Sequence, residues 1–204
     1  MNGPNELIYS KNVVEFVAVA NEFCELVENS ARYQTPQLLD ITRKLLPLLY
    51  FKASLLPETE SILDEELEKY VSELDYNVLQ QKWLQKLGEH DLYHEVIDPD
   101  LQFGSENVTA SISEHILDIY QDVKEFVSSY NFGNEEVMHD AIVECTLHFR
   151  EFWGQRLVNV LRALHLLVFS DIDWSSPDLS NYKPDDEDAG PSKWVDRFFS
   201  HDSE

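Results

Sequence analysis

The spacing of apolar residues constrains the fold of this chain most. Near residues 11 to 31, apolar side chains recur every three or four positions, which is the spacing of one face of an α-helix. That stripe consists of Val13, Phe16, Val17, Ala20, Phe23, Cys24 and Val27. The same period returns along most of the chain, and no segment alternates as a convincing β-strand does. We therefore predict an all-α protein.

Start and stop signals divide this pattern into about five helices. Ser10, Thr35, Ser72 and Asn134 have N-cap side chains, and Ser111 or Ser113 opens a further helix. The helices are expected near residues 11–31, 35–57, 72–88, 111–133 and 135–169. The signals predict a single helical bundle over residues 1–170.

The second and last of these helices are expected at the centre of the bundle. The second, TPQLLDITRKLLPLLYFKASLLP, is apolar almost all round, as buried helices are. Its internal Pro47 removes one backbone hydrogen bond and is expected to kink it. The last is the longest and forms a C-terminal core helix.

Two segments depart from the helical pattern. The connection at residues 88–110 is longer than bundles need, and such loops are functional or mobile. Residues 171–204 carry ten acidic and three basic residues, so we predict an acidic flexible tail. The tail ends in SKWVDRFFS, a short amphipathic segment predicted to dock on the body or on a partner. Its apolar face holds Trp194, Val195, Phe198 and Phe199.

The charge of the chain restricts its partners. The sequence has 39 acidic and 15 basic residues, a formal net charge of −24. Phosphate contacts need Lys and Arg, so no direct nucleic-acid binding is expected, and an anionic membrane surface repels such a chain. The excess indicates a self-repelling, solvated surface. The alternative is an acidic mimic that occupies a basic protein groove, which no periodicity of the carboxylates supports.

The cysteines and the N-terminus favour a cytoplasmic protein. Cys24 and Cys145 both lie on apolar stripes, which favours free thiols in a reducing compartment. The N-terminal stretch MNGPNELIYSK lacks the pattern of a signal peptide, and no apolar run is long enough to span a membrane.

Five blocks of the sequence resemble a known family. They are VVEFVAVANEFC, LLPLLYFKASLLPE, ASISEHILDIYQDVKEF, GNEEVMHDAIVEC and FWGQRLVNVLRALH. Together, over about residues 13–167, they resemble an uncharacterised bacterial family, a domain of unknown function that occurs in gut-type bacteria. The resemblance implies a compact helical domain and brings no assigned chemistry.

Two pairs of residues have spacings found in metal sites. Glu136 and His139 match the Glu-x-x-His motif of di-iron bundles, but such sites need two motifs and two further glutamates. Glu136 also points away from the apolar face, so we interpret it as part of an acidic first turn. His90 and His94 have the spacing for zinc on a helical turn, without an evident third protein ligand. We expect no tightly held metal and no cofactor.

Nucleophilic catalysis has little support in the sequence. No G-x-S-x-G elbow occurs, and six glycines leave little room for a phosphate-binding loop. Enzymatic activity is therefore the less favoured interpretation, although acid and base groups can converge in a fold without a linear motif.

Two cations fall on or beside apolar helix faces. Arg156 lies beside the stripe of the last helix and Lys52 among the leucines of the second. Because an unpaired buried charge is costly, each must be paired or reach solvent. They either form structural ion pairs or line a pocket for a small anion with Asn159, Tyr50 and Tyr120.

For Arg156 we predict a carboxylate partner inside the bundle. Asp122 is the first choice, followed by Asp118 and Glu28. If this pair is buried, Arg156→Leu leaves an unpaired carboxylate inside the bundle, so we predict that it lowers the free energy of unfolding by roughly 3 to 5 kcal/mol.

These patterns favour a protein–protein interaction or scaffold module with an unknown protein partner. The alternative is a small-anion-binding or metal-dependent helical protein, with its site near Arg156 and Lys52 or in the loop at residues 88–100.

Overall fold

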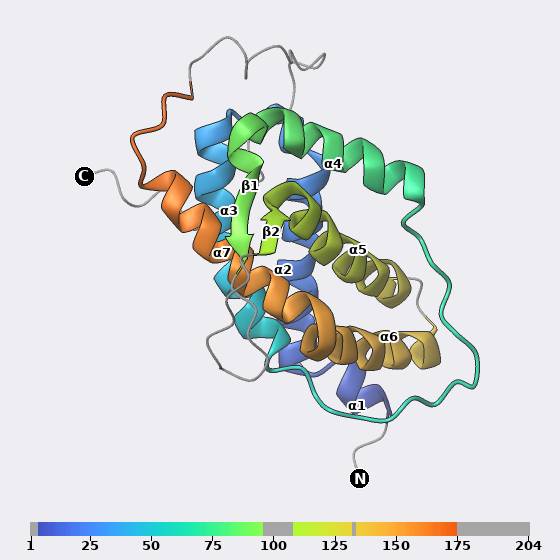
Figure 1. Ribbon diagram of the computed structural model, residues 1–204. Coiled ribbons are helices and arrows are strands. Elements are labelled where there is room, and N and C mark those ends of the chain that lie inside the picture. The colour runs from blue at the N-terminus through green and yellow to red at the C-terminus, as the bar shows by residue number, and fades with distance from the viewer. Residues whose placement is uncertain (1–3, 96–107, 132–133, 175–204) are drawn as a thin grey trace.

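The computed structural model describes residues 4–95, 108–131 and 134–174, and in this part the chain is predominantly helical (Figure 1). The α-helices are α1 (Pro4–Ile8), α2 (Lys11–Glu28), α3 (Thr35–Ala53), α4 (Glu73–Leu87), α5 (Ile112–Asn131), α6 (Glu135–His148) and α7 (Gly154–Val168). Short helical turns are η1 (Ser30–Arg32), η2 (Gly88–Asp91) and the π-helical η3 (Phe149–Trp153). The strands are β1 (Leu92–Glu95) and β2 (Val108–Ser111). Within this part, no helix has the length and apolar character needed to cross a membrane.

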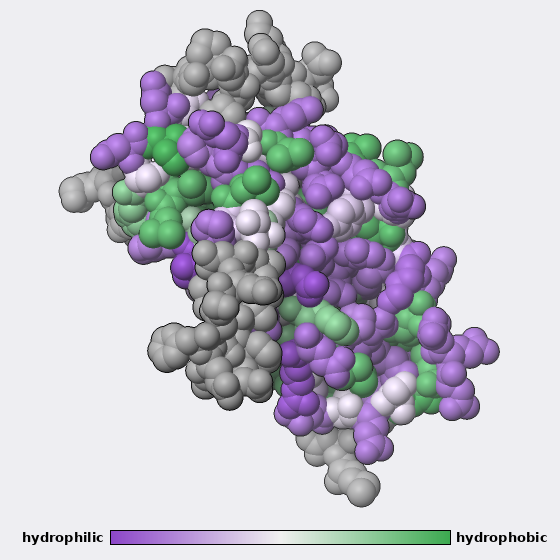
Figure 2. Space-filling view, in the orientation of Figure 1, coloured by the Kyte–Doolittle hydropathy of each residue, from purple (hydrophilic) through white to green (hydrophobic). Residues whose placement is uncertain are grey.

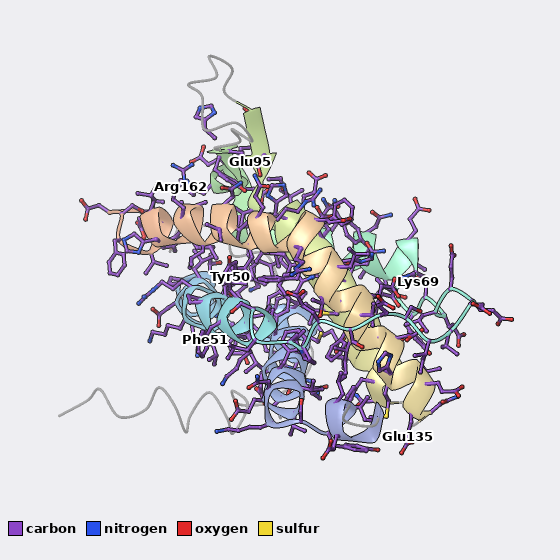
Figure 3. All side chains as sticks on the ribbon, turned by 90° about the horizontal axis from the view of Figure 1, so that it is seen from below. Tyr50, Phe51, Lys69, Glu95, Glu135 and Arg162 are labelled. Carbon is purple, nitrogen blue, oxygen red and sulfur yellow. The ribbon has the colours of Figure 1, made fainter. Side chains whose placement is uncertain are left out.

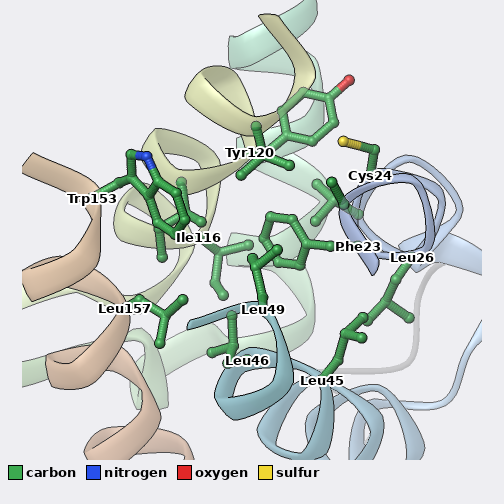
Figure 4. Close-up of a cluster of buried hydrophobic side chains, with 14 of the residues drawn as sticks. Phe23, Cys24, Leu26, Leu45, Leu46, Leu49, Ile116, Tyr120, Trp153 and Leu157 are labelled. Carbon is green, nitrogen blue, oxygen red and sulfur yellow. The ribbon is translucent and has the colours of Figure 1, made fainter. Parts of the chain in front are cut away.

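The core lies where α2, α3, α5 and α7 face one another. Phe23, Leu49, Ile116 and Leu157 come from these four helices and are fully buried (Figure 4). α3 packs against both α2 and α7, and α5 contacts α2, α4, α6 and α7. Each such side chain contributes roughly 1.5–3 kcal/mol on burial. The second and last helices both contribute to this core, but they are not the most buried helices, contrary to the prediction: α5 has eleven buried residues of 20, against nine of 19 in α3 and six of 15 in α7.

Several predicted helix starts have the expected caps. The side-chain oxygens of Ser72 and Asn134 accept hydrogen bonds from the backbone N–H groups of Asp75 and Glu136. Ser10 occupies the N-cap position of α2 but its side chain forms no capping hydrogen bond, and Thr35 is already helical, so Gln34 takes the N-cap position of α3. The Thr35 hydroxyl instead donates to the Lys86 carbonyl at the end of α4.

The prediction of one uninterrupted last helix is wrong in its middle. The chain stays helical from α6 to α7 but passes through the π turn of η3. Gly154 permits this turn: a Cβ there would lie 2.4 Å from the Phe149 carbonyl oxygen and 2.9 Å from the Phe149 ring. Apolar periodicity does not distinguish a π turn from an α turn of similar composition.

The expectation of no strand is also wrong. β1 and β2 pair antiparallel, with Leu92 opposite Ser111 and Glu95 opposite Val108. Asp91, which precedes β1, is only 2% exposed. Its carboxylate joins the two strands at this end of the hairpin, because it accepts hydrogen bonds from the Ser111 hydroxyl and the Ser113 N–H. The strands have only four residues each, so their alternation is too short to stand out in the sequence.

A short N-terminal helix was not predicted. α1 packs against α6, its Ile8 side chain is fully buried, and the hydroxyl of Tyr130 donates to the Ile8 carbonyl oxygen. Five residues are too few for a helical period to be recognised.

Residues 57–72 connect α3 to α4 without regular secondary structure, and we call them the strap. In Figure 1 the strap passes beneath α6 and then rises past the end where α5 meets α6.

Candidate functional site

Arg156 pairs with a carboxylate, as predicted, but not with the first choice. Its Nε lies 3.1 Å from Asp118 Oδ2, and the two side chains are 37% and 31% exposed. Asp118 also accepts a hydrogen bond of 2.8 Å from the Tyr76 hydroxyl. The expectation of a deeply buried pair is therefore wrong, because Arg156 reaches solvent at the edge of α7.

The two other candidate carboxylates have different partners. His148 Nδ1 lies 2.7 Å from Asp122 Oδ1, and this hydrogen bond raises the pKa of His148. Glu28 accepts hydrogen bonds from the Tyr120 hydroxyl and the Lys124 ammonium group. Asp122 and Glu28 are thus bound to these other partners and do not form an ion pair with Arg156.

The five residues proposed to line an anion pocket are distributed over separate contacts. Lys52 Nζ lies 2.7 Å from Glu15 Oε2 on α2, and Tyr50 packs its ring edge-on against Phe149. Asn159 Nδ2 donates to Glu95 Oε1 at 2.7 Å. The structure thus does not bring Arg156, Lys52, Tyr50, Tyr120 and Asn159 together around one site.

The hairpin rests on α5 and α7 through a set of polar contacts. The Tyr93 hydroxyl lies 2.7 Å from His115 Nδ1, and the Arg162 guanidinium donates to the His94 carbonyl oxygen. Burial raises the pKa of Tyr93. Figure 3 shows Glu95 and Arg162 on the hairpin side of α7, away from Tyr50 on α3. These contacts hold the hairpin in place.

The residues considered for metal binding are also separated. His90 belongs to η2 and His94 to β1, so they do not share the helical turn that the zinc hypothesis required. The ring of His90 contacts the ring of Trp174, with centroids 5.2 Å apart. Among the described residues, no group of three or more His, Cys, Asp or Glu side chains is arranged to hold a metal ion.

Both thiols are buried, Cys24 in α2 and Cys145 in α6, and neither forms a disulfide in the described part. Burial raises the pKa of each. A thiolate nucleophile is therefore disfavoured at both positions.

The predicted docking face of the tail, formed by Trp194, Val195, Phe198 and Phe199, lies outside the described residues.

His139, the second residue of the Glu-x-x-His motif, takes part in anchoring the strap. Its Nδ1 lies 2.8 Å from Asp140 Oδ1, and its Nε2 lies 3.3 Å from the Thr59 hydroxyl. Glu136 is exposed in the first turn of α6, as the acidic-turn interpretation expects. The two motif residues thus have different surroundings.

Asp140 is the main anchor for the first half of the strap. Its carboxylate accepts hydrogen bonds from the Ser61 hydroxyl and from the backbone N–H groups of Ile62 and Leu63. Burial alone would raise the pKa of Asp140, but these bonds and that from His139 outweigh it and lower the pKa below its ordinary value. The Asp140 carboxylate therefore accepts hydrogen bonds from the N–H groups of Ile62 and Leu63, which are not paired in a helix or a sheet.

Glu125 on α5 anchors the second half of the strap in the same way. Its two carboxylate oxygens accept hydrogen bonds from the N–H groups of Tyr70, at 2.7 Å, and Val71, at 2.9 Å. The neighbouring Lys69 forms an ion pair with Glu144 of α6. The strap is therefore tied at both ends to helices of the bundle.

Between these anchors the strap borders a hollow of about 660 Å³, which we call the strap hollow. Its lining residues are Ile62, Leu63, Asp64, Glu65, Glu66, Leu67, Glu68, Tyr70, Asn134 and Val137. In Figure 2, hydrophobic and hydrophilic surfaces lie next to one another on this lower-right side of the molecule. Apolar walls with an acidic border suit a peptide segment better than a reaction centre.

The sequence gives no clear local signal for the strap hollow, because the acidic stretch ETESILDEELEKYV has no clear helical period. A weaker signal is present in Ile62, Leu63 and Leu67, which are apolar residues embedded in an acidic run.

Comparison with known proteins confirms the family resemblance. The model of a family described as a domain of unknown function (DUF5063) matches residues 7–170. The solved structure of protein BF1032 from Bacteroides fragilis is similar to this chain, with 42% sequence identity and a TM-score of 0.72. The alignment covers 80% of this chain and 96% of the chain of BF1032. No curated protein matches the sequence. Because the match spans most of the chain, this protein belongs to the DUF5063 family of domains of unknown function.

Proposed function

We propose that this protein is a protein-interaction module and that the strap hollow receives a segment of a partner protein. The observation that carries the proposal is an open hollow of about 660 Å³ bordered by an extended segment that the bundle holds in place. Its apolar residue Ile62 is 50% exposed. A partner side chain that covers Ile62 removes apolar surface from water.

The way the strap is anchored supports this proposal. Asp140 and Glu125 fix its backbone at Ile62, Leu63, Tyr70 and Val71. Residues 64–68 between these points present their side chains without forming a helix or strand. A segment held in one conformation before binding loses little conformational entropy when a partner arrives.

A small-anion site at Arg156 or Lys52 has less support. Arg156 lies 3.1 Å from the carboxylate of Asp118, and Lys52 lies 2.7 Å from that of Glu15. An incoming anion would have to displace a carboxylate at either position. The strap hollow requires no such exchange.

Site-specific photo-crosslinking in cells tests the proposal. A benzophenone amino acid replaces Ile62 in one variant and Val14 on α2 in the other, since these side chains are 50% and 49% exposed. We expect a discrete crosslinked species from position 62 and none from position 14, with the attached partner segment mapped by mass spectrometry. Equal labelling from both positions, or none from position 62, would refute an interaction at the strap hollow.

A further inference from the structure

The carboxylates that border the strap hollow are unbalanced. Among the ten described residues that line it, four are acidic and none is Lys or Arg. Asp64, Glu65 and Glu66 are exposed, and none of the three forms an ion pair with another residue of the described part. A run of three like charges repels itself unless cations approach it.

Two cations of the surrounding segments, Lys69 and Arg150, form ion pairs with carboxylates other than those of residues 64–66. Lys69, the cation nearest in sequence, pairs with Glu144 on α6. Arg150 pairs with Glu58 before the hollow begins. Neither of these two cations therefore neutralises the carboxylates of residues 64–66 through an ion pair.

Apolar side chains lie directly beside these charges. Ile62 is half exposed. Leu63, Leu67 and Val137 line the same hollow and are partly exposed. An inorganic cation gains no binding energy from contact with apolar side chains. A peptide that carries both cations and an apolar side chain contacts both kinds of surface.

We propose that the strap hollow binds a basic, amphipathic segment of a partner protein, with Lys or Arg side chains on Asp64, Glu65 and Glu66 and an apolar side chain against Ile62. This inference rests on the proposed interaction function and specifies the chemistry of the partner. The net charge of −24 assists it, because a strongly negative protein attracts a cationic segment before contact.

The charge part of the proposal is tested with a defined probe. A fluorescent peptide of about twelve residues, composed of Lys and Leu in amphipathic order, is titrated with the full chain while anisotropy is recorded. The test variant is Asp64→Asn/Glu65→Gln/Glu66→Gln. Its matched control, Glu25→Gln/Glu151→Gln/Asp171→Asn, removes three exposed carboxylates that do not line the hollow.

We expect the test variant to weaken binding by about tenfold and the control by less than about twofold. Equal weakening by both variants would mean that the peptide responds only to overall charge, which overturns the proposed site. Undetectable binding of the peptide to the unaltered chain would overturn the proposed partner chemistry.

The apolar part is tested separately. Ile62→Ser is compared with Val14→Ser, which removes a side chain of similar exposure on α2. We expect only Ile62→Ser to weaken binding, and a peptide with Ser in place of each Leu to bind less tightly than the Lys and Leu peptide. If spermine or the Lys and Ser peptide binds as tightly, the hollow recognises cations alone and the amphipathic proposal fails.

The two proposals fail in different ways. The Lys and Leu peptide is added to the benzophenone variant at position 62 together with the mapped partner. Loss of the crosslink supports both proposals. A crosslink that persists unchanged would overturn the basic-segment inference while leaving the interaction function standing, whereas absence of any crosslink removes the interaction function itself.

Discussion

At the residue scale, Arg156 illustrates how exposure determines the energy of an ion pair. The sequence predicted a carboxylate partner correctly, because an Arg beside an apolar stripe needs one. It did not reveal that Asp118, one turn before Asp122, takes this role, since the exact rotation of α5 against α7 depends on packing. The partial exposure of both side chains lowers the expected contribution of the pair.

We now expect Arg156→Leu to lower the free energy of unfolding by about 1 kcal/mol or less, rather than by the loss expected of a buried pair. Urea denaturation measures this change. A double-mutant cycle with Asp118→Asn isolates the pair, since Asp118 also holds the Tyr76 hydroxyl. A loss above about 3 kcal/mol for Arg156→Leu would show that the pair behaves as a buried one.

Asp140 should be far more sensitive. In Asp140→Asn, the amide NH₂ takes the place of an oxygen that accepts hydrogen bonds, and the N–H groups of Ile62 and Leu63 lose their anion. We expect a destabilisation of about 3 kcal/mol, since hydrogen bonds to buried charged groups are among the stronger ones. Limited proteolysis should then cut within the strap before it cuts the helices.

The control for this experiment is Glu136→Gln, which alters an exposed carboxylate in the first turn of the same helix. It should change the free energy of unfolding by less than about 0.5 kcal/mol. If Asp140→Asn changes stability as little as this control, the carboxylate does not anchor the strap.

His148 provides a pH-dependent link between α5 and α6. The hydrogen bond to Asp122 raises the pKa of His148 in the folded state, assisted by the nearby Glu144 and opposed by burial and Lys69. A raised pKa means that its stabilising effect is complete below the unfolded value of about 6.5 and disappears as pH rises through the folded-state value. The stability difference between the unaltered protein and His148→Gln should therefore shrink as the pH rises above the unfolded-state value and through the raised folded-state value.

Chemical denaturation at several pH values measures this difference. In an Asp122→Asn background, the pH dependence of the His148→Gln effect should become much weaker, because the main cause of the raised pKa is gone. A difference that grows with pH would contradict the assigned contact.

At the scale of elements, the sequence predicted what local patterns determine. The positions of α2, α3, α4 and α5 follow from apolar stripes and caps such as Ser72, which act within a few residues. The strap was not predictable in this way, because its anchor joins Ser61 to Asp140, 79 positions later. The strap hollow exists only after this long-range contact forms, so no local pattern reveals it.

The π turn between α6 and α7 gives a test at this scale. Replacing Gly by Ala inside a helix ordinarily stabilises it by roughly 0.5–1 kcal/mol. At Gly154 the sign should reverse, because the added Cβ would lie 2.4 Å from the Phe149 carbonyl oxygen. We expect Gly154→Ala to destabilise by about 1–3 kcal/mol in thermal denaturation.

Gln155→Ala is the matched control, since Gln155 is the exposed next residue of α7. It should be neutral within about 0.5 kcal/mol. A stabilising Gly154→Ala would mean that the turn converts to a regular α-helix without cost.

At the scale of the whole molecule, the net charge of −24 opposes the compact state. Folding brings carboxylates closer together than they are in the unfolded chain, so their mutual repulsion lowers stability. The structure relieves part of this repulsion with ion pairs such as Lys52 with Glu15 and Lys124 with Glu28. Asp64, Glu65 and Glu66 remain unpaired within the described part.

The unaltered protein should therefore gain stability from salt. The Debye length falls from about 30 Å at 0.01 M to about 8 Å at 0.15 M, which screens repulsion between separate carboxylates. A relief of about 1 kcal/mol corresponds to a rise of roughly 2–4 °C in Tm for a chain of this size. Asp64→Asn/Glu65→Gln/Glu66→Gln should raise Tm at low salt and respond less to added NaCl, because it removes three adjacent carboxylates that have no ion pair in the described part. A Tm that falls with salt in both proteins would instead show that the ion pairs outweigh the repulsion, and the strap carboxylates would then impose no cost that a basic partner could relieve.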